Sequence, residues 1–448
     1  MNVKISKGAD IKIKGSADRV YANVANSKYY AVKPGDFHLL IPKMVVKIGD
    51  YVQAGDILFC DKNSEGIKFT SPVSGYVNDI VRGEKRKILK VIIEADEEIK
   101  YKKFNTSDLS TLDKNQIIDH LLNAGLWPLI RQRPFATIAN PSDSPKSIFI
   151  SSFDSAPLAP DNDFIFHGDD SVFQLGLDLV AQLCDGTTHL NLDGNSNPAK
   201  VFSNAKGVQI NHVFGPHPAG NVGVQIHHID PINKGDVVWY LTPQDIVTIG
   251  KFFRDGKYDA SKIIALTGSK VKKPRYYRVI QGTSIDPIVK SNLVNGEKRF
   301  ISGNVLTGKR ISSDGYLGFY DFQVSVITEG NYSEFFGWLL PGIHKYSLSR
   351  TFFSWLVSKR EYDLDTNNHG EERAYVVTGQ YESYMPIDIF PVQLIKAVLI
   401  EDIELMEKLG IYEVDTEDFA LCEYSCTSKI PVQSIIRKGL DIIKKECS

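Results

Sequence analysis

Two cysteines near the C-terminus have the spacing of iron–sulfur ligands. Cys422 and Cys426 form a C-x3-C pair in "LCEYSCTSKIPVQSII" (421–436), followed by a proline and an amphipathic stretch. This order is typical of the end of a C-x2-C-x2-C-x3-C cluster-binding run. The first two ligands of that run would fall at Thr416 and Phe419, which have no thiol. The stretch therefore predicts the vestigial frame of a cluster-binding turn.

Four of the ten histidines gather in "NHVFGPHPAGNVGVQIHHIDP" (211–231). Their spacing matches no standard zinc pattern, so no metal site is expected. "GPHPAG" favours a rigid turn that carries a functional loop, because prolines and glycines fix its backbone. A zinc hydrolase built on these side chains is the alternative, and it predicts stoichiometric zinc. The residues are His212, His217, His227 and His228.

Nucleotide-binding loops are the next chemistry to consider. "GNVLTGKR" (303–310) has the G-x4-G-K spacing of a phosphate loop, but Arg310 stands where Ser or Thr would hold magnesium. No helix is expected after it, so a β-hairpin turn is the interpretation. The chain also has no G-x-G-x-x-G stretch, the usual dinucleotide fingerprint.

Aromatic and cationic side chains are concentrated in "LWPLIRQRPFATIANP" (126–141): Trp127, Arg131, Arg133, Pro134 and Phe135. Such a surface suits a planar ligand with carbonyl groups, because rings stack and guanidinium groups donate hydrogen bonds. The alternative, which the residues alone favour, is a loop at a domain junction with one buried ion pair.

The N-terminal region has the pattern of a lipoyl- or biotinyl-like β-rich unit. In "VKIGDYVQAGDILFCDK" (46–62) apolar and polar residues alternate between Gly-Asp turns, and "SPVSGYV" (71–77) continues the pattern. Lys62 stands where such domains carry a modified lysine, but it lacks the flanking residues of biotin and lipoyl carriers. We expect an ordinary turn lysine. An independent carrier protein is the alternative, which an added mass on Lys62 would reveal.

The elements that must position these residues predict a multidomain α+β and α/β fold. The β-rich unit occupies 1–103. A Rossmann-like α/β domain follows at 104–256, with helices expected at 107–130 and 169–186 and strands at 147–153 and 163–167, among others. Short strands return at 257–330, and a mixed, α-rich region at 331–448 has helices expected at 390–410 and 432–446. With the cysteine pair at its end, that region is expected to close in a degenerate iron–sulfur-type helical domain.

Composition excludes several classes of function. Hydrophobic residues make up 42%, charged residues 24%, and the formal net charge is −2, so bulk charge recruits no nucleic acid. No run of 18 apolar residues and no signal-peptide core is found. Five scattered cysteines indicate a reducing cytoplasm.

Several long words together identify a family. "ISKGADIKIKG", "GLWPLIRQRPF", "FGPHPAGNVG", "ISGNVLTG", "EFFGWLLPG" and "LCEYSCTSKI" resemble the A-subunit family of the bacterial Na+-translocating NADH:quinone reductase (Na+-NQR), a relative of the C-subunit family of the Rnf complex. The resemblance covers essentially the whole chain. It implies an α/β domain similar to the flavin-binding domain of respiratory complex I, and a ubiquitin-like soluble-ligand-binding (SLBB) β unit at 257–330.

The resemblance also implies a role. The chain would be a peripheral protein on the cytoplasmic side of the bacterial inner membrane, docked to the integral-membrane and other subunits of a complex of six. It would hold no covalent cofactor, no metal and no catalytic residue. Flavin and iron–sulfur centres, NADH oxidation and Na+ transport would belong to partner subunits, and ubiquinone or menaquinone would be its ligand. A purely structural scaffold is the alternative.

The family's quinone assignment carries onto two stretches. The first is "LWPLIRQRPF", with the five residues named above. The second is "VKPGDFHLLIPKM" (32–44), with Phe37, Leu39 and Met44 as candidates. His38 stands where the family usually lacks a histidine. A quinone needs an apolar slot and one or two donors to its carbonyls, which these residue types supply.

Overall fold

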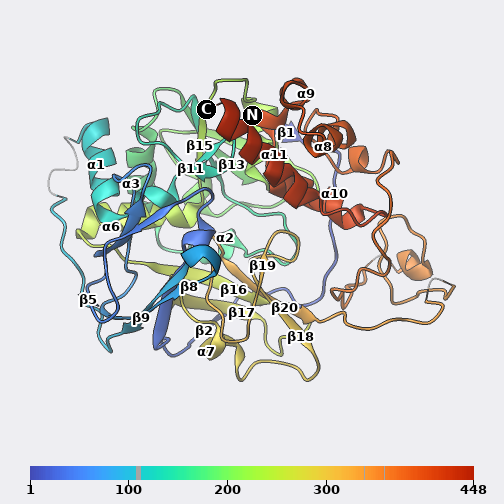
Figure 1. Ribbon diagram of the computed structural model, residues 1–448, viewed down its shortest axis with the longest axis horizontal. Helices are drawn as coiled ribbons and strands as arrows, with labels where there is room; N and C mark the ends of the chain where they lie inside the picture. Colours follow the sequence, from blue (N-terminus) through green and yellow to red (C-terminus); the bar gives the residue numbers. More distant parts are fainter. Residues whose placement is uncertain (107–111, 338, 358, 448) are drawn as a thin grey trace.

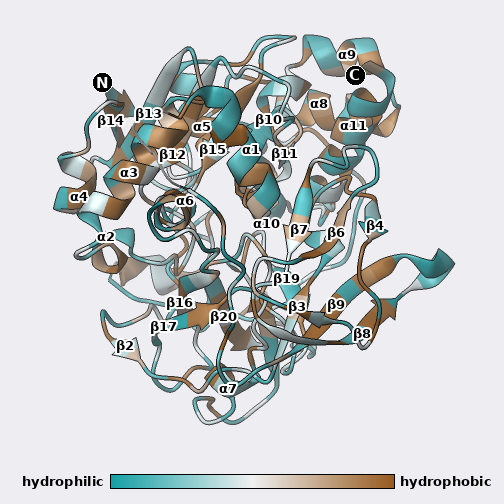
Figure 2. Cartoon of the chain, turned by 90° about the vertical axis from the view of Figure 1, so that its left-hand side faces the viewer, coloured by the Kyte–Doolittle hydropathy of each residue, from teal (hydrophilic) through white to brown (hydrophobic). Residues whose placement is uncertain are grey.

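The computed structural model describes residues 1–106, 112–337, 339–357 and 359–447. Its N-terminal β unit consists of two small sheets of mostly antiparallel strands, as the alternating pattern predicts. Lys62 lies exposed in the bend after β6. Figure 2 shows the hairpin of β8 and β9 extending from the body, hydrophilic at its tip. The first sheet has the order β3 (Tyr29–Val32), β9 (Ile88–Ala95), β8 (Gly75–Arg82), β5 (Tyr51–Val52); the second has β4 (Pro42–Met44), β6 (Ile57–Asp61), β7 (Lys68–Thr70).

The first two strands of the chain belong to the sheets of other domains. Strand β1 (Asn2–Lys4) pairs in parallel with β14 (Gln209–Phe214) of the α/β domain. Strand β2 (Tyr21–Ala22) pairs in parallel with β17 (Arg275–Ile280) of the SLBB unit. The N-terminal segment therefore runs across the molecule before it enters the β unit (Figure 1).

The α/β domain is built on a seven-stranded sheet of order β1-β14-β13-β12-β15-β10-β11. Strands β1, β14, β13, β12 and β15 are parallel, and β10 runs antiparallel to β15. Its helices include α3 and α6, which pack closely, because a Cβ on Gly176 would lie 2.1 Å from the carbonyl oxygen of Ile246. The elements not yet given are β10 (Arg131–Arg133), β11 (Thr137–Ile138), β12 (Ser147–Ser151), β13 (Thr187–Asp193), β15 (Val238–Leu241), α3 (Asp170–Ala181), α4 (Lys200–Ser203), α5 (Val222–Ile229) and α6 (Pro243–Asp255).

The SLBB unit has a six-stranded sheet of order β19-β18-β20-β16-β17-β2. Strands β18 and β19 form an antiparallel hairpin around 303–308, so "GNVLTGKR" is a hairpin turn, as expected. The remaining elements are β16 (Ser261–Thr267), α7 (Asp286–Val289), β18 (Lys298–Ser302), β19 (Lys309–Ile311) and β20 (Gln323–Thr328).

The C-terminal region ends in helices whose apolar core is continuous with residues of the α/β domain, among them Phe135, Val213 and Val224. The last helix, α11, contacts both α8 and α10. Figure 1 shows the segment that precedes α8, in orange, extending from the body on the right. The helices are α8 (Pro391–Leu399), α9 (Ile403–Lys408), α10 (Ala420–Ser425) and α11 (Val432–Cys447).

Two helix expectations in the α/β domain differ from the structure. The helix expected at 107–130 is α1 (Lys114–Ala124), which begins at a capping box between Asp113 and Gln116 and ends at Gly125, a left-handed residue. The part of that expectation at 107–111 lies outside the described residues. The helix expected at 169–186 ends at Ala181 instead of Gly186.

Two further expectations were wrong because local capping decided the structure. The run 163–167 is no strand: Asp161 accepts a hydrogen bond from the backbone N–H of Phe164 and starts the short helix α2 (Asn162–Ile165). The helix expected at 390–410 is divided into α8 and α9, because Glu401 has φ 57° and Asp402 caps the second helix.

Candidate functional site

The stretch "IRQRPF" lies where the α/β sheet meets the C-terminal helices. Strand β10 pairs with β15, and the peptide bond between Arg133 and Pro134 is cis. Phe135 then turns the chain toward β11 with φ 82°. Pro134 and Phe135 are buried, and the Phe135 ring lies edge-on to Tyr412. The stretch is thus a closed turn between two domains.

Arg133 is fully buried and its terminal nitrogens are both bound. One nitrogen donates to Asp418 Oδ2 at 3.1 Å, and the other donates to Glu417 Oε1 at 2.7 Å. Burial opposes the charge, but the carboxylates of Asp418, Asp415 and Glu417 outweigh it and raise the pKa of Arg133 well above its ordinary value. The arginine is therefore part of a buried ion pair at the junction, the alternative that the residues alone favour.

Arg131 has a different environment. Its guanidinium lies between the rings of Tyr240 and Tyr320, at 4.5 and 4.4 Å from their centroids. Tyr320 donates its hydroxyl to the carbonyl oxygen of Pro128 at 2.7 Å. Burial raises the pKa of both tyrosines, so both rings stay neutral. The stacked arginine joins the SLBB unit to the α/β sheet.

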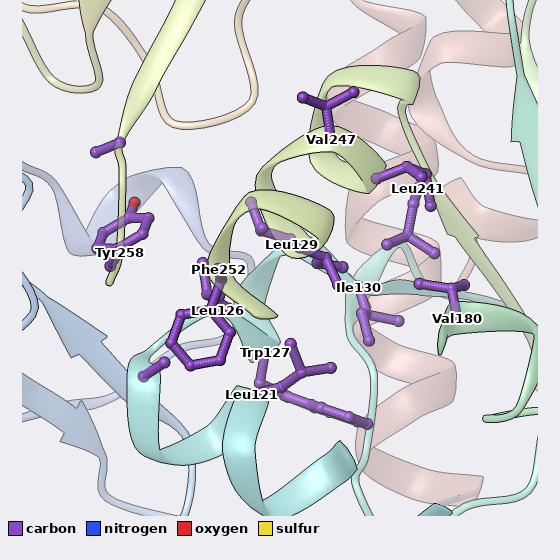
Figure 3. Close-up of a cluster of buried hydrophobic side chains, with 14 of the residues drawn as sticks. Leu121, Leu126, Trp127, Leu129, Ile130, Val180, Leu241, Val247, Phe252 and Tyr258 are labelled. Atoms are coloured by element: carbon purple, nitrogen blue, oxygen red, sulfur yellow. The ribbon is translucent and has the colours of Figure 1, made fainter. Parts of the chain in front are cut away.

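Trp127 belongs to the core of the α/β domain. Its indole is fully buried, donates Nε1–H to the carbonyl oxygen of Ala139 at 2.7 Å, and lies edge-on to Trp239. Figure 3 shows it among apolar side chains that include Leu121 and Ile130. Trp127 therefore packs in the core beneath the stretch, and its ring has no exposed face for a ligand.

The second candidate stretch reaches the SLBB residue on which Arg131 packs, Tyr320. Phe37 is buried against Phe69 and Phe319, with ring centroids 4.5 and 4.7 Å away, and its ring is edge-on to Tyr320 at 5.8 Å. Tyr320 therefore contacts both Phe37 and Arg131.

The other candidates of this stretch lie apart from that contact. Leu39 is exposed, and Met44 on β4 is partly buried. His38 Nε2 lies 2.7 Å from Asp441 Oδ1 on α11. The structure thus brings together Phe37, Arg131 and their neighbours, and leaves Leu39 at the surface.

A small cavity lies where three domains meet, and Phe37 packs against two of its lining residues, Phe69 and Phe319. Its volume is about 20 Å³, room for about one water molecule. Val32, Phe69 and Phe319 supply apolar walls, while Lys33 and Gln281 supply hydrogen-bond donors. Apolar walls with a few polar groups are the lining that small-molecule sites have.

The two donors are held by neighbouring groups. Lys33 Nζ donates to the carbonyl oxygen of Tyr316 at 3.0 Å and lies 3.4 Å from Asp36 Oδ2. The Tyr258 hydroxyl donates to Gln281 Oε1 at 3.0 Å, and Gln281 Nε2 donates to the carbonyl oxygen of Phe319 at 3.5 Å. Both donors keep hydrogens for a ligand.

Sequence reasoning missed the loop that lines one side of this cavity through Leu317 and Phe319. Phe319 and Tyr320 belong to the aromatic loop, residues 316–322, whose sequence "YLGFYDF" reads as part of a strand. The loop is fixed by Lys262, whose Nζ donates to the carbonyl oxygens of Phe319 and Asp321 at 2.8 and 3.1 Å. The concentration of aromatic residues next to glycine was the available signal.

The cysteine and histidine candidates form no common centre. Cys422 and Cys426 are buried, and the Tyr381 hydroxyl donates to Cys426 Sγ at 2.8 Å. Burial raises the pKa of the Cys422 thiol. Within the described ranges, no group of three or more His, Cys, Asp or Glu side chains is placed to hold a metal.

Of the four histidines of 211–231, His227 and His228 lie edge-on to each other, with ring centroids 5.0 Å apart. His217 is buried, accepts or donates at Nδ1 with Ser155 Oγ at 3.0 Å, and burial lowers its pKa to about 4. His227 Nδ1 lies 2.7 Å from Glu413 Oε2, so it joins α5 to the C-terminal helices. His217 and His227 are thus tied to separate partners.

Comparison with known proteins places the chain. Residues 3–96 match the family model "NqrA N-terminal barrel-sandwich hybrid domain", 112–258 match "NqrA second alpha/beta domain", and 263–313 match "NQRA C-terminal domain". The predicted fold class is confirmed by these matches, whereas the exact domain boundaries remain predictions. Among the parts of the chain that the structure describes, no helix is long and apolar enough to cross a membrane.

Full-length relatives agree with the family models. The A subunits of the Na(+)-translocating NADH-quinone reductases of Marinomonas sp. and Pseudomonas aeruginosa are each 37% identical, over 99% of this chain and 99% and 100% of theirs. The protein of that name from Haemophilus influenzae is 38% identical, over 99% of this chain and 100% of its own. The chain therefore belongs to the A-subunit family of the Na+-translocating NADH-quinone reductases and is one of the subunits of that complex.

Proposed function

We propose that this subunit binds the head of a ubiquinone or menaquinone in the cavity at the junction of the three domains. One observation carries the proposal: the predicted stretch 32–44 supplies Val32, Lys33 and Asp36 to the cavity. Its next residue, Phe37, contacts Tyr320, on which Arg131 of the other predicted stretch packs. The cavity has room for about one water molecule, so in this proposal its walls move apart when the ligand enters. A quinone ring is planar and apolar, with two carbonyl acceptors, and therefore needs such walls and one or two donors.

The cavity has the groups that a quinone head requires. Val32 and Phe319 offer apolar contact for the ring, with Phe69 behind them stacked on Phe59. Lys33 and Gln281 each have a hydrogen to donate to a carbonyl oxygen. Arg131 acts at a distance, because its stack on Tyr320 positions the aromatic loop. Arg133 has no part in ligand contact in this proposal, since its terminal nitrogens are occupied.

The protein would serve the complex by holding quinone, while partner subunits supply electrons. In this proposal flavin and iron–sulfur centres, NADH oxidation and Na+ transport belong to those subunits. The chain sits at the periphery of the complex, on the cytoplasmic side of the inner membrane, and contributes to its assembly. Support for this division comes from membership in the A-subunit family.

Binding can be tested by calorimetric titration of the purified chain with a short-chain ubiquinone. We expect saturable binding, weakened about two- to tenfold by Gln281→Leu through loss of one hydrogen bond, and more by Phe319→Ala. Gln182→Leu, at an exposed position after α3, is the matched control and should bind as the wild type does. No saturable heat with the wild-type chain, or equal affinity in the Gln281 and Gln182 variants, would contradict the cavity.

A purely structural scaffold is the second candidate. The buried ion pairs of Arg133 with Asp418 and Glu417 favour it, because they join the α/β domain to the C-terminal helices. A scaffold predicts that the chain assembles with its partners but takes up no quinone, which the same titration distinguishes.

A further inference from the structure

The projecting segment, residues 332–357 without 338, leaves most of its large apolar side chains exposed. Phe335 is 88% exposed and Leu356 is 65% exposed. Its regular structure, within the described residues, is one 3-10 turn at Phe353–Leu356. In Figure 1 it extends from the body in orange. The exposed apolar residues are Phe335, Phe336, Leu339, Leu340, Ile343, Phe353, Trp355, Leu356 and Val357.

Such a surface indicates an interface. Exposed apolar patches of this kind on soluble domains mark protein or membrane contacts, because water contact with them is unfavourable. Aromatic side chains are also the residue type that protein interfaces favour at their centres.

The segment is organised even though its apolar side chains face solvent. Its two arms are joined by a hydrogen bond from the backbone N–H of Phe353 to the carbonyl oxygen of Pro341 at 3.1 Å. Lys345 joins them again: its Nζ donates to the carbonyl oxygen of Gly337 at 3.0 Å and pairs with Glu334, and its carbonyl oxygen accepts from Ser354. The apolar side chains are therefore carried by a loop whose two arms are held together by hydrogen bonds and an ion pair. Such a loop loses less conformational entropy when it binds a partner.

The charges distinguish a protein partner from a lipid surface. The stretch 331–360 contains four basic residues and one acidic residue, Glu334. Lys345 and Arg360 are turned onto the segment itself, the latter donating to the carbonyl oxygen of Ile343 at 2.9 Å. Adsorption to anionic lipid needs basic side chains free to face the headgroups. Of the four lysines and arginines of this stretch, Arg350 and Lys359 are exposed. Two such side chains are too few to attract an anionic lipid surface, but they suit carboxylates at the edge of a protein partner.

We infer that the projecting segment is the surface by which this subunit docks onto another subunit of the complex, one that offers an apolar face with carboxylates at its margin. The inference rests on the proposed assembly role and gives that role a surface. It does not depend on quinone binding, which involves a cavity on other residues.

The test is assembly of the complete complex. The complex is produced with an affinity tag on a membrane-embedded subunit, and the amount of this chain that co-purifies is measured for the wild type and for F335E/L339E. We expect about a tenfold or greater loss of occupancy in the variant, because charged side chains are placed at the centre of the apolar contact. The matched control is I48E/I400E, at positions 61% and 69% exposed on other elements, and it should assemble normally.

Two measurements separate the alternatives. Unfolding curves of the purified F335E/L339E chain should match the wild type, so that loss of assembly reflects the interface. Binding of wild-type chain to vesicles of phosphatidylethanolamine and phosphatidylglycerol, and its mass in solution, should show no lipid adsorption and no self-association through these residues.

The remaining outcomes contradict the inference. Normal assembly of F335E/L339E would show that the projecting segment is not the docking surface, while the proposed assembly role would stand. Loss of assembly in I48E/I400E as well would show that the effect is general. Vesicle binding or dimer formation that F335E/L339E abolishes would assign the segment to lipid or to a second copy. Failure of the wild-type chain to co-purify would contradict the assembly role itself, whatever the outcome of the quinone titration.

Discussion

The arginine junction, which consists of Arg131 and Arg133 with their partners, buries its side chains, whereas the projecting segment exposes them. At the junction, Arg133 is buried with carboxylates bound to both terminal nitrogens, and Arg131 is stacked between two tyrosines. In the projecting segment, Phe335 and its neighbours are left in water by a loop that is otherwise hydrogen-bonded. At the junction the charged groups of both arginines have partners within the chain, although Arg131 Nε, Arg133 Nε and Asp418 Oδ1 are buried without a hydrogen-bond partner. In the segment the backbone and Lys345 are hydrogen-bonded within the chain, while the large apolar side chains face solvent.

The contrast indicates where the chain depends on other proteins. Substitutions at the junction should reduce the free energy of unfolding of the isolated chain. Substitutions in the segment should leave that free energy unchanged and act on assembly. Variants in the two regions can therefore test the separation.

Arg133→Met should destabilise the isolated chain by about 3–5 kcal/mol, because it leaves Asp418 buried without its partner. Urea denaturation followed by circular dichroism measures the loss. The double variant R133M/D418L removes both charges and should recover most of the stability. A loss below about 1 kcal/mol in the single variant would show that the ion pair does not join the domains.

Lys262, which holds the aromatic loop, should make the free energy of unfolding depend on pH in the alkaline range. Burial lowers its pKa to about 8, against an ordinary value of 10.5. Between these two values the unfolded chain binds the proton and the folded chain does not, so folding becomes more favourable as the pH rises. We expect the stability of wild type relative to Lys262→Met to increase by up to about 3 kcal/mol across this window.

Urea denaturation of both proteins at several pH values across this window checks the expectation. The difference between the two proteins isolates Lys262 from the buried tyrosines, which titrate in both. A constant difference across the window would mean that the lysine stays charged in the folded state.

Arg131→Leu should cost about 1–2 kcal/mol, since it removes a guanidinium stacked between two rings and leaves Tyr240 and Tyr320 without their shared partner. The variant should also bind short-chain ubiquinone more weakly, because the aromatic loop loses its support. Arg131→Lys, which keeps the charge without the planar group, should lie between wild type and Arg131→Leu in both measurements.

The smallest effect belongs to the projecting segment. F335S/L339S should change the stability of the isolated chain by no more than about 0.5 kcal/mol, because both side chains are exposed in the folded and unfolded states. Leu340→Ser, at 52% exposure, is a third position that should behave alike. A clear loss of stability would show that the segment packs against its own chain.

Much of the fold was readable from local sequence. Alternation of apolar and polar residues indicated the β unit, and an apolar run indicated the strand expected at 147–153, which is Ser147–Ser151 in the structure. The capping box at Asp113 explains why α1 begins where it does. The errors arose where a cap outweighed the apolar pattern, as at Asp161 and Asp402.

The candidate site was only partly readable. The sequence pointed to Arg133 but not to its partners, because Asp418 is 285 residues away. The cavity could not be predicted at all, since its walls come from Val32, Thr70, Gln281 and Phe319, which meet only in the folded chain. Periodicity reports which face of an element is buried, not which distant element covers it.

Strand β1 is synthesised long before the strand with which it pairs. Its partner residues, His212–Phe214, follow more than 200 residues after Asn2–Lys4. At about 5–20 residues per second this is a wait of roughly 10–40 s. During that time β1 has no partner strand, so a bulky group fused next to it would hinder its later pairing with β14.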